Sequence, residues 1–474
     1  MTTQTEKAKE KRLSSVKDMT TGTPMGLIVT FFIPILIGNF FQQFYSFVDS
    51  VVVGKGIGDT ALAAVGNTGS VHFLILGFAM GLTGGLGICI SQSFGAGDMN
   101  TLRQEIAMSV LVCLGISLVI TVASLASMRA IFSFLQTPQD MLKDTLDYFR
   151  VILLGCAATI FNNFFMTLLR SVGNSRVPLV SMLLSSAINI ALDILFIFPL
   201  HLGVAGAALA TVLSQVLSAL YCYLHLRTIP GLLPVRKDWQ IKTDVLSRLV
   251  TKGLPVAFMN SVTAVGGMVL QYFVNAMGTA YVAAYAASMK LCGLFEQAGV
   301  TVGLSILTFT GQNFGALHYD RIKKGVRSGL ILSILVNIPL SLMQLLIPEK
   351  LTSFMLTDPR IITHTREFLF VTGIAIFPLG FLFVFRNACQ GMGHTFVPML
   401  SGILEVAMRV VMAKFLVPRM QFQGVAIAEV SAWIAAAVML MITYKVYYAL
   451  SGAGLSSGNS HRQFQSNSPA SKEL

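Results

Sequence analysis

Long apolar segments dominate the sequence, and the first of them is the most informative. Residues 31–53 are long enough to cross a hydrocarbon core of ~30 Å, which takes ~20 apolar residues in a helix. The polar residues inside this segment recur at spacings of three and four, which places them on one helix face. They are Asn39, Gln42, Gln43, Ser46 and Asp49. The pattern predicts a membrane-spanning helix with one polar face that ends in a carboxylate.

Segments of this kind continue along the chain, and together they predict an all-α polytopic membrane protein with twelve transmembrane helices. A charged stretch at 229–248 separates the first six from the last six. We therefore expect a basic tail (1–24), an N-lobe (25–228), a linker (229–248), a C-lobe (249–450) and a disordered tail (451–474). The predicted spans are 26–53, 61–90, 103–128, 141–168, 178–199, 204–227, 250–276, 281–309, 326–348, 362–388, 397–417 and 424–449.

The composition supports a membrane protein. Hydrophobic residues make up 54% of the chain and charged residues 11%, whereas soluble domains carry ~25% charged residues. All six cysteines lie inside apolar segments without paired spacing, which indicates small buried side chains and neither disulfides nor metal ligands.

The net charge of +12 raises the question of a nucleic-acid partner. However, the basic residues collect in alternate loops, including the N-terminal tail, the 228–252 region and 321–327. This is the distribution that the positive-inside rule describes. We expect a multi-pass protein of the inner (plasma) membrane with both termini and the linker in the cytoplasm, and no nucleic-acid partner.

The sequence also repeats itself at an offset of 220 residues. The segment 92–96 (QSFGA) recurs at 312–316 (QNFGA), and 173–178 (GNSRVP) recurs at 393–398 (GHTFVP). Matches in one register indicate a duplicated six-helix unit. Because six is even, both copies have the same orientation in the membrane, as parallel repeats do. An alternating-access transporter uses such symmetry directly.

With these segments in their order, the chain resembles the MATE family (multidrug and toxic compound extrusion transporters) over residues ~20–450. The resemblance implies two six-helix bundles around a V-shaped cleft, and export of organic cations and drugs against inward flow of H⁺ or Na⁺. The matching segments are Pro34 with 48–50 (VDS), 61–66 (ALAAVG), the two FGA segments, 169–178 (LRSVGNSRVP) and 203–210 (GVAGAALA).

Polar residues on four N-lobe helices are the candidate coupling site. Asn189 and Asp193 share one helix face at i and i+4, as do Thr211 and Gln215. Carboxylates, amides and hydroxyls that converge could bind Na⁺ or exchange a proton. The resemblance implies a site made of Asp49, Tyr148, Asn163, Asn189, Asp193 and Thr211, with Asn162 as the alternative to Asn163.

Each of these residues also has a structural interpretation. Asp49 lies near the end of its span, where a carboxylate could reach the lipid headgroups instead. The amides and hydroxyls could stabilise helix packing, worth ~0.6 kcal/mol each on average.

The second lobe differs in its charges. Ala413 stands at the position equivalent to Asp193, and Thr263 lies near where some MATE branches place a Glu. We expect Glu405 and Arg409 to neutralise each other as an intramembrane pair or to contact substrate. Lys290 and Glu296 cannot share a helix face, so each needs another partner. The candidate residues of a substrate cleft are Glu296, Gln43, Asn260 and Gln271.

Together, these features predict a monomeric secondary transporter that is not an enzyme, needs no cofactor and exports small cationic or amphipathic drugs. The coupling ion, H⁺ or Na⁺, would bind at Asp49 and Asp193. Its binding would neutralise a shared polar pocket and let the first span shift, using the flexibility that Pro34 provides. The alternative is a flippase for lipid-linked precursors from the same wider superfamily.

Overall fold

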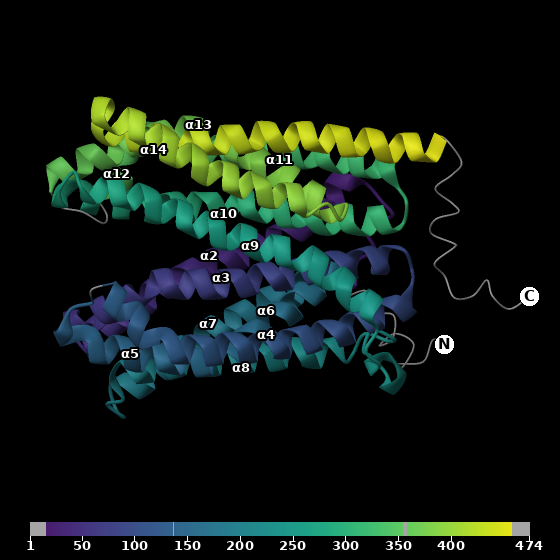
Figure 1. Ribbon diagram of the computed structural model, residues 1–474, viewed down its shortest axis with the longest axis horizontal. Helices are drawn as coiled ribbons and strands as arrows, with labels where there is room; N and C mark the ends of the chain where they lie inside the picture. The colour runs from purple at the N-terminus through teal and green to yellow at the C-terminus, as the bar shows by residue number, and fades with distance from the viewer. Residues whose placement is uncertain (1–15, 136, 354–357, 457–474) are drawn as a thin grey trace, which may run out of the picture.

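The computed structural model describes residues 16–135, 137–353 and 358–456, and its apolar segments are all helical (Figure 1). One short 3₁₀ helix, η1 (Arg236–Trp239), lies in the linker. The α-helices are α2 (Pro24–Gly56), α3 (Asp59–Gly95), α4 (Met99–Phe134), α5 (Gln139–Leu154), α6 (Cys156–Ser171), α7 (Arg176–Ile197), α8 (Gly203–Leu226), α9 (Thr243–Asn275), α10 (Thr279–Gly315), α11 (Tyr319–Leu346), α12 (Pro348–Ser353), α13 (Pro359–Gly391) and α14 (Phe396–Ser456).

These helices form the twelve predicted spans, although three of the spans differ in detail from the prediction. The fourth span consists of α5 and α6, which meet at Gly155 with a bend of 49°. A Cβ on Gly155 would lie 2.2 Å from Val212 Cγ2, so the glycine lets α8 pack closely at the bend. The last two spans are both assigned to α14, which is kinked at Gln421 (φ 48°, ψ −125°).

We expected the C-lobe to end at residue 450 and a disordered tail to follow. This boundary is wrong by six residues, because α14 continues to Ser456. An established helix gains one hydrogen bond for each residue added, which favours such an extension. The remainder of the predicted disordered tail, 457–474, lies outside the described residues, as does 1–15 of the basic tail.

The helices form two lobes, with α3–α8 in one and α9–α14 in the other, while α2 lies between them and packs on both (Figure 1). We call the end that carries the linker and the turns at 96–98 and 316–318 the base, and the opposite end the tips. The base lies on the right of Figure 1.

At the base, the duplicated segments of the two lobes clasp each other with two-fold symmetry. Gln92 Nε2 donates to the carbonyl of Gly391 at 2.8 Å, and Gln312 Nε2 donates to the carbonyl of Ser171 at 2.9 Å. Both the donors and the acceptors are related by the offset of 220. The repeat seen in the sequence is therefore the contact that closes the base.

Two glycines let the backbones approach within this clasp. A Cβ on Gly95 would lie 2.0 Å from the backbone oxygen of Gln312, and a Cβ on Gly315 would lie 1.9 Å from that of Gln92. A charged contact crosses beside them, where Arg248 of α9 pairs with the buried Glu105 of α4 at 3.3 Å.

Helix α2 belongs to both lobes. Its first half, with Ile28 and Phe31, is buried in a core formed with α10, α11, α13 and α14. Its second half packs on the N-lobe: Gly38 lies against Met182 of α7, and Val53 shares a core with Ile197. The change of partner falls close to Pro34, which lies inside the helix.

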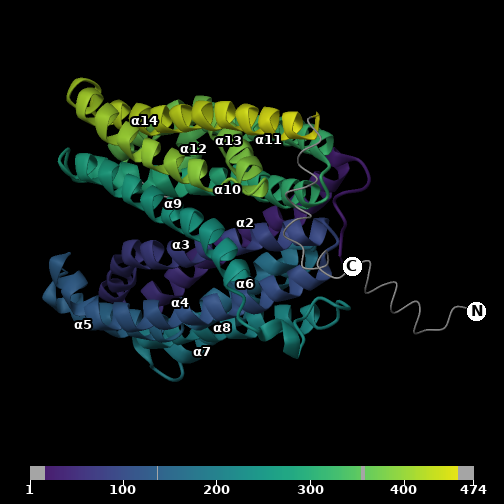
Figure 2. The ribbon, with the colours of Figure 1, turned by 45° about the vertical axis from the view of Figure 1, so that its right-hand side comes forward.

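Toward the tips, the lobes part. Asn39 donates to Thr301 Oγ1 at 3.0 Å, and Asn260 donates to the carbonyl of Gly77 at 3.1 Å. Among the described residues, no hydrogen bond between the lobes lies closer to the tips than these two. Figure 2 shows the ribbons diverging from there toward the tips on the left. The structure is thus closed at the base.

Candidate functional site

The two N-lobe carboxyls of the predicted site lie together in the tip half of the lobe. Asp49 comes from α2 and Asp193 from α7, and their side chains are within hydrogen-bonding reach of each other. Asp193 is fully buried, whereas Asp49 is half-buried. Asp49 therefore faces the inside of the lobe and does not extend to the headgroups.

Asn189 and Thr211 complete the buried side of this site. One of the two orientations of the Asn189 amide satisfies both of its polar atoms. In it, the nitrogen donates to Asp193 Oδ2 and the oxygen accepts from the Thr211 backbone N–H, both at 3.2 Å. In the opposite orientation its nitrogen donates to Thr211 Oγ1 at 3.4 Å. Asn189 is thus held between α7 and α8 beside the acid pair.

Two tyrosines flank the acids. Tyr148, on α5, is buried and lies close to both Asp49 and Asp193. Tyr45 of α2 also lies close to both, and sequence reasoning missed it. Its position four residues before Asp49 puts it on the same helix face, so the spacing could have identified it.

The two carboxyls of the acid pair lack part of the hydrogen bonding that buried carboxyls need. Asp49 Oδ1 and Asp193 Oδ1 are buried and have no hydrogen-bond partner among the residues that the structure describes. Two adjacent carboxylates cannot both keep a negative charge in a poorly hydrated site without a compensating charge. A shared proton or a bound Na⁺ would supply it.

Asn163 is not hydrogen-bonded to this group in the described structure. Its amide donates to the carbonyl of Thr159 on its own helix at 2.9 Å. The alternative, Asn162, accepts a hydrogen bond from Ser218 of α8 at 2.8 Å. Gln215, one turn beyond Thr211, accepts from the Thr159 hydroxyl.

The four candidate cleft residues do not form one cluster. Asn260 bridges the lobes through Gly77, and Gln271 donates to Asn275 on its own helix at 2.6 Å. Gln43 is exposed on α2. Glu296 is half-buried on α10 and lies near the C-lobe charges, with Glu429 its closest electrostatic neighbour.

The C-lobe charges pair differently from the prediction. Arg409 makes a bidentate contact with Glu429, at 2.8 and 2.6 Å. Glu405 lies 3.8 Å from Arg409 and pairs with Arg386. The expected Glu405–Arg409 ion pair is present at 3.8 Å, but helix packing brings Glu429 closer to Arg409 and Arg386 closer to Glu405. Lys290 is exposed, so it needs no buried partner.

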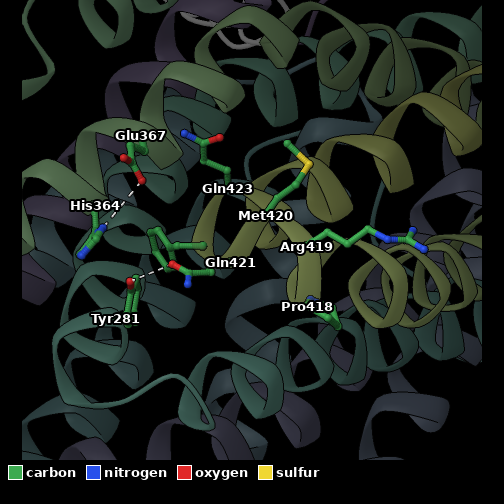
Figure 3. Close-up of a pocket in the computed structure, with 9 residues that line it drawn as sticks. Tyr281, His364, Glu367, Pro418, Arg419, Met420, Gln421 and Gln423 are labelled. Carbon is green, nitrogen blue, oxygen red and sulfur yellow. Dashed lines mark hydrogen bonds and ion pairs between the residues drawn. The ribbon is translucent and has the colours of Figure 1, made fainter.

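A small pocket of about 350 Å³ opens at the tip of the C-lobe, beside the kink in α14 (Figure 3). The Tyr281 hydroxyl donates to Gln421 Oε1 at 3.4 Å, and His364 lies 3.7 Å from Glu367. The Tyr281 and His364 rings contact each other with centroids 4.3 Å apart and a tilt of 32° between their planes. The Tyr281 contact thus reaches the side chain of Gln421, the residue at the kink of α14.

The family comparison agrees with the duplication. The MatE family model matches the chain twice, at residues 34–195 and 255–415. The two matched ranges cover most of both lobes and contain Asp49, Asp193 and the C-lobe charges Glu296 and Arg409.

Curated relatives extend over most of the chain. It is 24% identical over 431 residues to the probable multidrug resistance protein YoeA of Bacillus subtilis, covering 88% of this chain and 92% of that protein. It is 26% identical over 384 residues to the multidrug export protein MepA of Staphylococcus haemolyticus, covering 79% and 84%.

Solved structures share the fold. A crystal structure of MATE in complex with MaL6 has a TM-score of 0.87 and 22% identity, covering 92% of this chain and 99% of that one. A multidrug resistance MATE family transporter in an outward-facing conformation has a TM-score of 0.86, also at 22% identity, covering 92% and 98%. With the double family match and the two-lobe fold, the chain belongs to the MATE family of membrane transporters.

Proposed function

We propose that this transporter exports small cationic or amphipathic drugs in exchange for inward movement of H⁺ or Na⁺. The observation that carries the proposal is the pair Asp49 and Asp193, in which each carboxyl keeps one buried oxygen without a partner among the residues that the structure describes. Such a pair changes its charge when it gains or loses a cation, and that change is what coupling requires.

The position of Asp49 links this charge to movement of the lobes. It lies in the N-lobe half of α2, while the first half of the same helix is buried in the C-lobe core. When a cation neutralises the acid pair, the desolvation penalty on the pocket falls and α2 can repack on α7. Pro34 provides a point of bending between the halves, because it removes one helix hydrogen bond.

We assign the base to the cytoplasm. The basic residues Arg248, Arg321 and Lys324 lie in helix ends at the base, and basic residues concentrate on the cytoplasmic side of membrane proteins. The structure then has the outward-facing arrangement, and both termini and the linker are cytoplasmic.

Glu296 is our candidate for contact with a cationic drug. Its neighbours are Glu429, Arg409 and Glu405, and no ion pair to Glu296 is present in the described part of the chain. A ligand with a positive charge would balance it.

The flippase alternative receives less support. A lipid-linked precursor with its phosphates calls for a strongly cationic cavity. The buried guanidinium groups of Arg386 and Arg409 are instead neutralised by Glu405 and Glu429.

The test is Asp49→Asn, which imitates the neutral state permanently. We expect binding of a fluorescent cationic drug in detergent to persist, and gradient-driven efflux from proteoliposomes to fall by more than about tenfold, equivalent to 1.4 kcal/mol. Imposing pH and Na⁺ gradients separately identifies the ion. The matched control is Asp147→Asn, since Asp147 lies on the same lobe in a weak ion pair with Arg150.

Two outcomes would change the proposal. If Asp49→Asn keeps efflux at the control level, the residue has no part in coupling. If it loses drug binding together with efflux, Asp49 is a direct counter-ion of the drug instead.

A further inference from the structure

A seam of buried amides and hydroxyls runs through the N-lobe from the acid pair toward the base. It lies where α6, α7 and α8 meet. Asp193 and Ser181 are twelve residues apart on α7, so the seam is roughly 18 Å long at 1.5 Å per residue. Its members are Asn189, Thr211, Thr159, Gln215, Asn162, Ser218, Ser181 and Cys222, and most of them are nearly or fully buried.

The base half of the seam is one directed chain of hydrogen bonds. Cys222 Sγ donates to Ser181 Oγ at 3.2 Å, and the Ser181 and Ser218 hydroxyls are 2.6 Å apart. Ser218 Oγ donates to Asn162 Oδ1 at 2.8 Å. Because Ser218 gives its only proton to Asn162, the Ser181 hydroxyl is the donor to Ser218, where its proton is shared between the hydroxyl and the backbone carbonyl, the latter at 3.1 Å.

The tip half joins this chain to the acids in steps of one helix turn. Asn189 contacts Asp193 and Thr211, and Gln215 accepts from the Thr159 hydroxyl. Thr211, Gln215 and Ser218 follow at i, i+4 and i+7 on α8. Neighbours at these spacings have Cβ atoms ~5–6 Å apart, a gap that one water molecule between polar groups can bridge.

The C-lobe does not repeat the hydrogen-bonded side chains of this seam. At the offset of 220, Leu379 and Leu382 replace Thr159 and Asn162, and both are buried. On the second half of α14, which corresponds to α8, the positions of Gln215, Ser218 and Cys222 are Ala435, Val438 and Ile442. The buried side chains of this segment include Ala432, Trp433, Ala436 and Leu440, and also Glu429. The equivalent C-lobe junction therefore lacks the chain of amides and hydroxyls, although it keeps the buried Ser401 at the position of Ser181. It is occupied by ion pairs instead, formed by Arg386, Glu405, Arg409 and Glu429.

We propose that this seam is a proton path that connects the Asp49–Asp193 pair with the base-side solution inside the N-lobe, apart from the space between the lobes. The proposal rests on the proposed coupling function of the pair. The hydroxyls of Thr159, Ser181 and Ser218 both donate and accept, which allows a proton to pass by relay through them and the bridging waters.

The same geometry selects protons over Na⁺. A bare metal ion needs several oxygen ligands at each position. At Ser218 the seam offers two neighbouring side-chain oxygens, and these are already hydrogen-bonded at 2.6 and 2.8 Å. At the base end, Arg170 lies near Cys222 with its Nε unpartnered in the described chain. Its fixed positive charge opposes entry of a metal cation.

The experiment uses Asn162→Leu combined with Ser218→Ala, which makes these two positions apolar, as Leu382 and Val438 are at the equivalent C-lobe positions. Charge movement is recorded on solid-supported membranes after a pH jump on one side, with everted and right-side-out vesicles giving the two sides. We expect the response to a base-side jump to slow by about tenfold or more. The response to a tip-side jump and the drug affinity in detergent should stay at wild-type levels.

The matched control is Ser305→Ala, which removes a fully buried hydroxyl from the C-lobe whose partner is the carbonyl of Thr301 on its own helix. Wild-type responses to both jumps in the seam variant would overturn the inference, because the base-side proton would then use another route. Equal slowing on both sides with lost drug binding would also overturn it, since the seam would then only support folding of the site.

Asp193→Asn separates this result from failure of the proposed function. If it abolishes charge movement while the seam variant behaves as wild type, the coupling function stands and the path is wrong. If Asp193→Asn itself keeps coupled transport, the proposed function fails first.

Discussion

The symmetric clasp at the base allows a quantitative test of how the lobes separate. In Gly95→Ala the new Cβ would lie 2.0 Å from the backbone oxygen of Gln312, and in Gly315→Ala 1.9 Å from that of Gln92. Since real Cβ atoms essentially never come closer than 3.0 Å, each substitution forces the backbones at least about 1 Å apart.

Crowding of this kind costs roughly 1–3 kcal/mol, which lowers the ratio of base-closed to base-open molecules by about 5- to 150-fold. The gain in helix propensity from Gly to Ala, about 1 kcal/mol, stabilises both conformations and favours neither. Because one separation relieves both contacts, we expect the double variant to cost less than the sum of the two single variants.

The assay is pulsed EPR between spin labels at the exposed base positions Arg227 and Lys324, one on each lobe. Each single variant should shift population to longer distances. The controls are Gly84→Ala on α3 and Gly293→Ala on α10, where a Cβ would meet nothing within 4 Å. Distance distributions that match those of the controls, or fully additive costs in the double variant, would refute the clasp as the closing contact.

Two further predictions follow from the proposed topology and from the C-lobe charges. A cysteine at the exposed Lys237 should resist a membrane-impermeant reagent added to intact cells, and one at the exposed Arg360 should react; the opposite pattern would invert the base assignment. The linker residue Asp238 is unsuitable for this labelling because it is buried against Arg103 at 3.1 Å. In the C-lobe, Arg409→Gln should lower the free energy of unfolding by about 3–5 kcal/mol, because it leaves Glu429 buried without its partner. Adding Glu429→Gln should recover most of this loss in thermal unfolding, and no recovery would mean that the pair contributes more than mutual neutralisation.

The positions of the spans could be predicted because each apolar segment reports directly on its burial in the membrane. The pairing of Asn189 with Asp193 could be predicted as well, since spacing within one helix fixes which residues share a face. The duplication could also be read from the sequence, although not that 92–96 and 312–316 contact each other.

What could not be predicted depends on how one helix is rotated against another. Arg409 has Glu405 one turn away in the sequence, yet it binds Glu429, twenty residues on, because the last span of α14 packs against that face. The bend at Gly155 likewise reflects the approach of Val212 from α8. Such contacts are set by tertiary packing, which spacing within one segment does not report.

The two lobes share the contacts at the base but differ in the polar residues of their interiors, and this difference has a physical reason. At the clasp, Gln92 and Gln312 each bind the other lobe, so a change in one copy alters a contact that both copies share. The interior of each lobe has no such constraint, and there the positions of Asn189 and Asp193 became Arg409 and Ala413. A transporter built this way can close symmetrically while only one lobe carries the acid pair. If cation exchange is confined to that pair, neutralising Arg409 together with Glu429 should leave the ion dependence of transport unchanged even where it alters stability or drug affinity.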